Sequence, residues 1–157
     1  MATLKVAVGS DHAGFQGDQP YKPELIAHLG VKGAEVLNCG TDSAESVDYP
    51  DIAERVCETI LAGDADLGIL ICGTGIGMSM TANRIRGIRA AVCTSPQMAK
   101  LAREHNHANV LCVGVRLSTL DECKAIIDAF ISEPWSTEER HRRRVQKIEG
   151  AGGEVLR

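Results

Sequence analysis

An uninterrupted apolar run at residues 67–71 leads straight into Cys72 and a glycine-rich turn, Gly73-Thr74-Gly75-Ile76-Gly77. A strand without polar positions belongs inside a parallel sheet that helices cover on both faces. Similar short apolar runs occur at 4–8, 35–37, 90–93 and 110–113, and stretches with helical spacing separate them. This alternation predicts an α/β fold in which βαβ units surround one parallel sheet.

The segments between these runs predict helices. In the segment 49–61, Ile52, Val56 and Ile60 recur every four residues and form one apolar stripe. A final helix is predicted to begin near Ser136, because Ser136-Thr137-Glu138-Glu139 has the form of a capping box and Pro134 precedes it. The other predicted helices are 23–29, 76–84, 95–104 and 119–131.

Length and composition limit the organisation and the partners of the chain. Its 157 residues, 44% of them apolar, predict one domain over 1–149 and a frayed tail at 150–157. The net charge of −4 argues against a general role on nucleic acid or on a membrane surface. Six cysteines without a C-x-x-C pair, and no visible secretory signal or membrane-spanning run, predict reduced thiols and a cytoplasmic location.

The thiol of Cys72 is the first candidate for chemistry. Backbone N–H groups of a glycine-rich turn converge on negative charge, so they favour a thiolate that can act as a base or a nucleophile. The turn lacks the last glycine of a dinucleotide-binding G-x-G-x-x-G motif, because Met78 stands there, and no Gly-Lys-Ser/Thr follows as in a P-loop. A small anion or a developing oxyanion is therefore the expected ligand, and a buried structural cysteine is the alternative.

Polar side chains also follow the other predicted strands, at the edge where open parallel sheets bind ligands. These segments are Ser10-Asp11-His12, Asn38-Cys39-Gly40-Thr41, Cys93-Thr94-Ser95 and Gly114-Val115-Arg116. The segment His105-Asn106-His107 offers a neutral histidine for proton transfer, with a backbone-bonded loop histidine or a metal ligand as alternatives. Arg140 and Arg144 share a helical face and can hold a phosphate, unless the basic run is only a solvated surface.

Together, several ordered motifs closely resemble the ribose-5-phosphate isomerase B family over about residues 5–148. The motifs are Gly9-Ser10-Asp11-His12-Ala13-Gly14-Phe15, Asp48-Tyr49-Pro50, Cys72-Gly73-Thr74-Gly75-Ile76-Gly77-Met78-Ser79, Ala82-Asn83, Gly87-Ile88-Arg89-Ala90, His105-Asn106, Asn109-Val110-Leu111 and Glu139-Arg140-His141. The resemblance implies a Rossmann-like three-layer α/β/α sandwich with a five-stranded parallel sheet. It also implies a C-terminal helix that extends to a partner subunit, in a homodimer or dimer of dimers with shared active sites.

The resemblance further implies that the chain interconverts ribose 5-phosphate and ribulose 5-phosphate through a cis-enediolate, without a metal or cofactor. Cys72 would be the base, Thr74 would orient it, and the N–H groups of Gly73, Gly75 and Gly77 would stabilise the enediolate oxygen. His105 would open the sugar ring with Asp11 as its acid–base counterpart. The residues implied in substrate binding are Tyr49 and Asn106 for the sugar, and His12, Arg116, Arg140, Arg144 and the assisting His141 for the phosphate.

The chain falls in the cysteine branch of that family, because Met78 occupies the position of the glutamate base of the other branch. It departs from the family pattern at 16–23, which is longer and more broken than usual. It also departs at His107, where an aspartate is usual and would stabilise a charged His105. Alternative activities are isomerisation of a six-carbon sugar phosphate such as allose 6-phosphate or galactose 6-phosphate, thiol-dependent hydrolysis or transfer, and phosphosugar binding without catalysis.

Overall fold

A computed structural model describes residues 2–152 of the chain. Five parallel strands form one sheet in the order β2-β1-β3-β5-β4. The strands are β1 (Lys5–Ser10), β2 (Glu35–Asn38), β3 (Leu67–Cys72), β4 (Ala90–Val92) and β5 (Val110–Gly114). Each lies within two residues of a predicted apolar run, and β3 is buried along its whole length. The central position of β3 explains why its sequence has no polar face.

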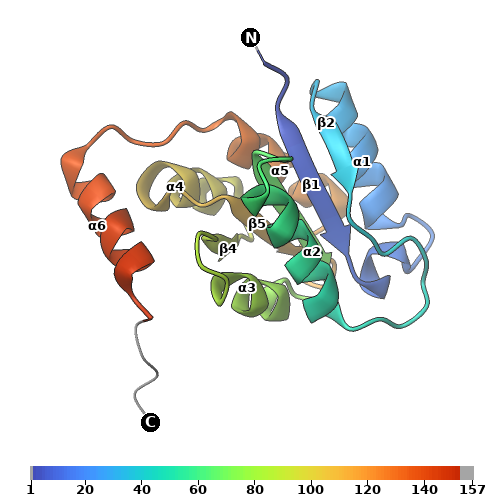
Figure 1. The fold of residues 1–157 in the computed structure, drawn as a ribbon. Coiled ribbons are helices and arrows are strands. Elements are labelled where there is room, and N and C mark those ends of the chain that lie inside the picture. Colours follow the sequence, from blue (N-terminus) through green and yellow to red (C-terminus); the bar gives the residue numbers. More distant parts are fainter. Residues whose placement is uncertain (1, 153–157) are drawn as a thin grey trace.

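Helices cover both faces of the sheet (Figure 1). On one face, α1 (Tyr21–Val31), α4 (Pro96–Asn106) and α5 (Leu120–Ser132) share a hydrophobic core with one side of the strands. On the other face, α2 (Tyr49–Leu61) and α3 (Ile76–Asn83) pack against Ala7, Leu70 and Cys112. This is the predicted three-layer α/β/α sandwich, and its strand carboxyl ends meet at one edge.

The last helix, α6 (Glu139–Gly150), lies beside α4 and apart from the sheet (Figure 1). It begins three residues later than predicted, and the predicted capping box is wrong. Ser136 Oγ accepts a hydrogen bond from Glu138 N, two residues on, so its hydroxyl forms a local turn before the helix begins. A capping box does form elsewhere, between Thr119 and Glu122 at the start of α5.

The segment after β1 and the C-terminal end of α6 also differ in detail from the sequence prediction. A 3-10 helix, η1 (His12–Phe15), follows β1. Residues 16–20 of the broken segment form a loop with Gly17 in the left-handed region, and residues 21–23 begin α1. α6 continues to Gly150, one residue into the predicted tail, whose residues 153–157 lie outside the described part of the chain. None of the described helices combines the length and apolar character needed to cross a membrane.

Candidate active site

Cys72 ends β3 at the carboxyl edge of the sheet, and its side chain is only 5% exposed. The backbone N–H of Gly75 donates a hydrogen bond to Cys72 Sγ over 3.0 Å. A donor aimed at sulfur stabilises negative charge there. The turn that the sequence singled out therefore folds back onto its own thiol, at the start of α3.

Two glycines of the turn are required by close contacts. Gly75 has a φ of +79°, and a Cβ there would lie 3.2 Å from backbone atoms of Cys112 and Val113. A Cβ at Gly77 would lie 2.5 Å from Cζ of Tyr49, so the tyrosine ring rests directly on the first turn of α3. Side chains at these positions would push the turn away from β5 or displace Tyr49.

A cavity of about 430 Å³ opens beside this turn. It is bounded by the ends of β1, β3 and β5 and by the first turns of α2 and α3. Its lining includes eight residues predicted for the site: Asp11, His12, Tyr49, Cys72, Gly73, Thr74, Gly77 and Arg116. The cavity therefore combines a thiol, a carboxylate, an imidazole and a guanidinium, which suits proton transfer on an anionic substrate.

Asp11 and His12 are both held by backbone contacts. Asp11 caps η1, because its Oδ1 accepts a hydrogen bond from Ala13 N at 2.9 Å, and its own N–H donates to Ile71 O at 3.1 Å. The Nδ1 atom of His12 accepts from Val47 N at 3.3 Å. In the neutral ring this contact assigns the proton to Nε2.

Thr74 within the glycine turn and Arg116 beyond β5 also line the cavity. Thr74 Oγ1 accepts a hydrogen bond from Ile76 N at 3.2 Å, whereas the hydrogen bond to sulfur comes from Gly75. Arg116 lies over Gly73, since a Cβ there would be 3.2 Å from its Nη1. This brings a positive charge to the cavity beside His12.

Six predicted residues are not among those that line this cavity: Gly75, which donates to Cys72 Sγ from the turn itself, and five others. These five lie in the last turn of α4 or on α6: His105, Asn106, Arg140, His141 and Arg144. The rings of His105 and His141 lie 4.2 Å apart between centroids, and His141 is only 4% exposed. Arg140 Nε donates to Glu138 Oε2 at 2.6 Å, and this contact lowers the pKa of that carboxyl. Asn106 faces a larger cavity of about 1050 Å³ between the 84–91 segment, α4 and the end of α6.

His107 contacts Trp135 and has a different environment from the one expected. It caps α4 with a φ of 49°, and its ring stacks on Trp135 with centroids 3.9 Å apart and planes 2° from parallel. Burial lowers the pKa of His107 to about 4, and the charges of Arg89 and Arg103 add to the effect. Its imidazole is therefore neutral at pH 7, and the aromatic neighbour of His105 is His141.

Sequence reasoning missed several residues at these sites. Ile76 and Met80, on the exposed side of α3, also line the thiol cavity. Met78, by contrast, is fully buried in the core under α3. The contact between the tilted rings of His105 and His141 had no sequence signal, because α4 and α6 come together only through tertiary packing. Within residues 2–152, no cluster of three or more His, Cys, Asp or Glu side chains is placed to hold a metal ion.

Residues 6–148 match the family model described as Ribose/Galactose Isomerase. The chain is 45% identical over 144 residues to ribose-5-phosphate isomerase B of Escherichia coli, covering 92% of this chain and 93% of that protein. Among solved structures, ribose 5-phosphate isomerase of Thermotoga maritima is 50% identical with a TM-score of 0.88, covering 94% of this chain and 98% of that one. The type B enzyme of Trypanosoma brucei is 42% identical with a TM-score of 0.90, covering 96% of this chain and all of that one.

These matches extend over nearly the whole sandwich, including the Cys72 turn and the histidines of α4 and α6. The sequence motifs, the sheet order and the contents of the cavity lead to the same assignment. The chain therefore belongs to the ribose/galactose isomerase family.

Proposed function

We propose that the protein interconverts ribose 5-phosphate and ribulose 5-phosphate by proton transfer at Cys72. The observation that carries this proposal is the Gly75 N–H donated to Cys72 Sγ at 3.0 Å, inside a cavity that also holds Asp11, His12 and Arg116. Relatives at 45% and 50% identity bear the name ribose 5-phosphate isomerase, which supports the same reaction.

The chemistry follows from what an aldose–ketose exchange requires. The Cys72 thiolate removes the proton on C2 of the open-chain aldose, and the electrons of that C–H bond form the C1–C2 double bond of a cis-enediolate. Negative charge develops on O1, where the N–H groups of the glycine turn stabilise it. Cys72 then returns the proton to C1 while the O2 proton moves to O1, which gives the ketose without a metal or cofactor.

The phosphate and the sugar ring need residues that the thiol cavity lacks. Arg116 and His12 supply positive charge there, but His105, Asn106, Arg140, His141 and Arg144 lie on α4 and α6. We infer that a second copy of the chain brings these residues to the cavity, so that each site is shared in a homodimer or a dimer of dimers. Exposed Ile76 and Met80, at 46% and 66%, support a contact surface beside the cavity.

In the shared site, His105 of the partner subunit opens the furanose ring, and Asp11 is its acid–base counterpart. Arg140 and Arg144 of the partner subunit bind the phosphate opposite Arg116. Binding at the phosphate, remote from C1 and C2, fixes the open-chain sugar in the geometry for proton transfer.

The test is ribulose 5-phosphate formation by chelator-treated protein beside its Cys72→Ala variant. We expect chelator-resistant turnover that falls by about 10²- to 10⁴-fold in Cys72→Ala, with sugar-phosphate binding retained. Cys39→Ser is the matched control, because this half-buried thiol lies outside the cavity. Undiminished turnover in Cys72→Ala would refute the base assignment.

The same assay separates the alternatives. Conversion of allose 6-phosphate or galactose 6-phosphate in place of ribose 5-phosphate would identify a six-carbon substrate. Tight binding without turnover of any of these sugars would indicate a phosphosugar-binding protein.

Sharing of the site is tested by mixing two inactive variants, Cys72→Ala and His105→Ala. In a mixed dimer, one of the two sites combines an intact Cys72 with an intact His105. Random exchange of subunits should therefore restore about a quarter of the wild-type activity, since half the dimers are mixed. Activity that stays at the level of the separate variants contradicts the shared site.

A further inference from the structure

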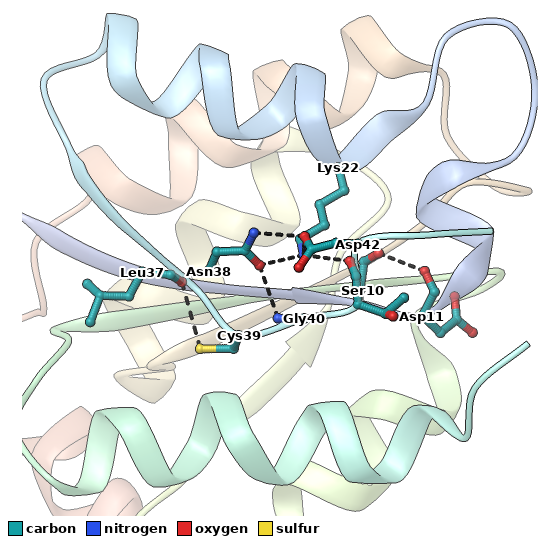
Figure 2. Close-up of polar contacts among 9 residues, drawn as sticks. Ser10, Asp11, Lys22, Leu37, Asn38, Cys39, Gly40 and Asp42 are labelled. Carbon is teal, nitrogen blue, oxygen red and sulfur yellow. Dashed lines mark hydrogen bonds and ion pairs between the residues drawn. The ribbon is translucent and has the colours of Figure 1, made fainter. Parts of the chain in front are cut away.

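Lys22 is a fully buried lysine whose ammonium lies beside the site and outside the cavity. Lys22 lies in the first turn of α1 and is only 1% exposed. Its Nζ donates to Asn38 Oδ1 at 2.6 Å, to Thr41 O at 2.7 Å and to Asp42 Oδ1 at 3.2 Å (Figure 2). All three ammonium protons have an acceptor, as a buried charge requires.

The surroundings of Lys22 show that its charge is matched locally. Burial lowers the pKa of Lys22, while its contacts with Asp42 oppose that effect. Asn38 and Lys22 in turn lower the pKa of Asp42, which favours the charged form of that carboxyl. Leu25 and Leu29 on the same helix fill the apolar core, and Lys22 is the position where α1 reaches a polar turn. An apolar side chain at this position could stabilise the fold as well as the buried ion pair does. The presence of an ammonium group therefore suggests a function other than stability.

The acceptors of Lys22 lie in the 38–42 segment, which runs from the last residue of β2 into the turn that follows it. This turn also holds the end of β1: Thr41 N donates to Ser10 O at 2.7 Å, and Ser10 N donates to Gly40 O at 2.8 Å. Ser10 Oγ then donates to the carbonyl of Asp11 at 2.7 Å (Figure 2). Three hydrogen bonds, from Lys22 to Thr41, from Thr41 to Ser10 and from Ser10 to Asp11, therefore connect the Lys22 ammonium to the backbone of Asp11.

The same turn continues towards His12. Beyond Asp42 the chain reaches Val47, whose N–H donates to His12 Nδ1, and then enters α2 at Tyr49. Anchoring the turn at Thr41 and Asp42 therefore affects the cavity from two directions, through Asp11 at the cap of η1 and through the segment that contacts His12.

We propose that Lys22 is a positioning residue for the active site, whose buried ammonium fixes the 38–42 turn and thereby sets the places of Asp11 and His12. The kinetic part of this inference rests on the proposed isomerase function. Lys22 Nζ also lies 5.6 Å from the centroid of the Phe15 ring on η1. Its hydrogen bonds, however, all go to the 38–42 segment, so the proposed effect is exerted through the Thr41–Ser10 and Val47–His12 hydrogen bonds.

The test compares Lys22→Met, which keeps the length of the side chain and removes its donors, with Leu29→Ala. Leu29 is fully buried in the same helix, so its truncation destabilises the fold away from the turn. At a temperature where both variants are folded, we expect Lys22→Met to lower kcat/KM by about 10- to 100-fold and Leu29→Ala to change it by less than about twofold. Equal effects of the two variants, or an unchanged kcat/KM in Lys22→Met, would overturn the proposal.

A second pair keeps the test decisive if Lys22→Met fails to fold. Asn38 accepts from both Lys22 Nζ and Gly40 N. Asn38→Ala removes that acceptor, together with the donor that Asn38 Nδ2 offers to Asp42 Oδ1 at 2.8 Å, and should lower kcat/KM by about tenfold. Glu35→Ala, which truncates an exposed side chain on the same strand, should stay within about threefold of wild type. Loss in both variants, or in neither, contradicts the role of the turn.

A readout without turnover distinguishes failure of this inference from failure of the proposed function. The ring resonance of His12 in an NMR spectrum, assigned with His12→Asn, should shift in Lys22→Met and stay in place in Leu29→Ala. If the wild type converts no sugar phosphate, this comparison alone decides the positioning role, and an unmoved His12 signal in Lys22→Met rejects it.

Discussion

The amide of Gly75 lies 3.0 Å from the sulfur of Cys72, and the same residue starts α3 in the left-handed region at φ +79°. One glycine therefore serves two purposes: its conformation turns the chain from β3 into α3, and its N–H is aimed at the thiol. The backbone of β5 lies behind it, 3.2 Å from where a Cβ would stand.

Gly75→Ala should reduce catalysis more than stability. The new Cβ meets backbone that cannot yield easily, so the turn must shift and the N–H must leave the sulfur. We expect kcat to fall by about 10²-fold or more, as for the loss of one oxyanion-hole donor. The free energy of unfolding should drop by about 1–3 kcal/mol, measured by urea denaturation.

Gly63→Ala is the matched control, because Gly63 has a φ of +82° and nothing within 4 Å of its Cβ position. It carries the same backbone strain away from the cavity and should leave kcat unchanged. An equal loss of kcat in both variants would show that strain, and not the N–H to sulfur, explains the effect.

Thiol alkylation should separate Cys72 from the core cysteines. Burial raises the pKa of Cys57 to about 12 and the pKa values of Cys93 and Cys123 to about 11, so these thiols stay protonated. Since iodoacetamide attacks thiolates, we expect native protein to be labelled at Cys72 and at half-buried Cys39. Peptide mapping should find that inactivation follows Cys72 labelling, and rapid labelling of Cys57 would contradict this assignment.

The positions of the central strands β1, β3 and β5 could be predicted from their apolar runs. These strands are buried on both faces, so their sequences have few polar positions. The end of β3 at Cys72 and the helix 49–61 followed from local pattern alone. The predicted start of α6 was wrong. Ser136 and Glu139 match a cap motif, but the backbone N–H of Ser136 donates a hydrogen bond to Glu104 O on α4. A long-range contact, invisible in a local pattern, decided where the helix begins.

Only part of the candidate site lies together at one edge of the sheet within a single chain. Asp11, His12 and Arg116 converge on Cys72 because they all follow parallel strands at one edge. His105 and Arg140 do not, because α4 and α6 hold them away from that edge within a single chain. Lys22 was missed altogether, since a lysine in a surface helix gives no sign that a turn 16 to 20 residues later will enclose it.

Arg140→Ala should raise KM more than it lowers kcat. Its guanidinium is exposed and paired only with Glu138 among the described contacts, so a phosphate can take that partner's place. We expect KM for ribose 5-phosphate to rise by about 10- to 100-fold, the range for losing a hydrogen bond to a charged group. Arg143→Ala, which removes an exposed arginine from the same helix, should leave KM unchanged, and an equal rise in both would indicate a general charge effect.

The lowered pKa of His107 predicts that the folded protein loses stability in mild acid. Its pKa is about 4 in the folded protein, because burial and the charges of Arg89 and Arg103 oppose protonation, and Glu149 offsets them in part. In the unfolded chain a histidine titrates near 6.5, so above that pH both states are neutral and the full stability is present. As the pH falls from about 6.5 to about 4, the unfolded state takes up the proton first, and stability is lost by on the order of 1–3 kcal/mol. Below pH 4 both states are protonated, so this group causes no further loss.

The measurement is urea denaturation of wild type and His107→Asn at several pH values from 4 to 7.5. Asparagine tolerates the φ of 49° at this position and does not titrate, so it preserves the cap of α4 while removing the pH-dependent group. The variant should be less stable than wild type at pH 7.5, because the stacking on Trp135 is lost. Its stability should also vary less between pH 6.5 and 4, so the two curves converge in acid. Parallel curves would mean that the stacked imidazole of His107 is not the group that makes the fold sensitive to acid.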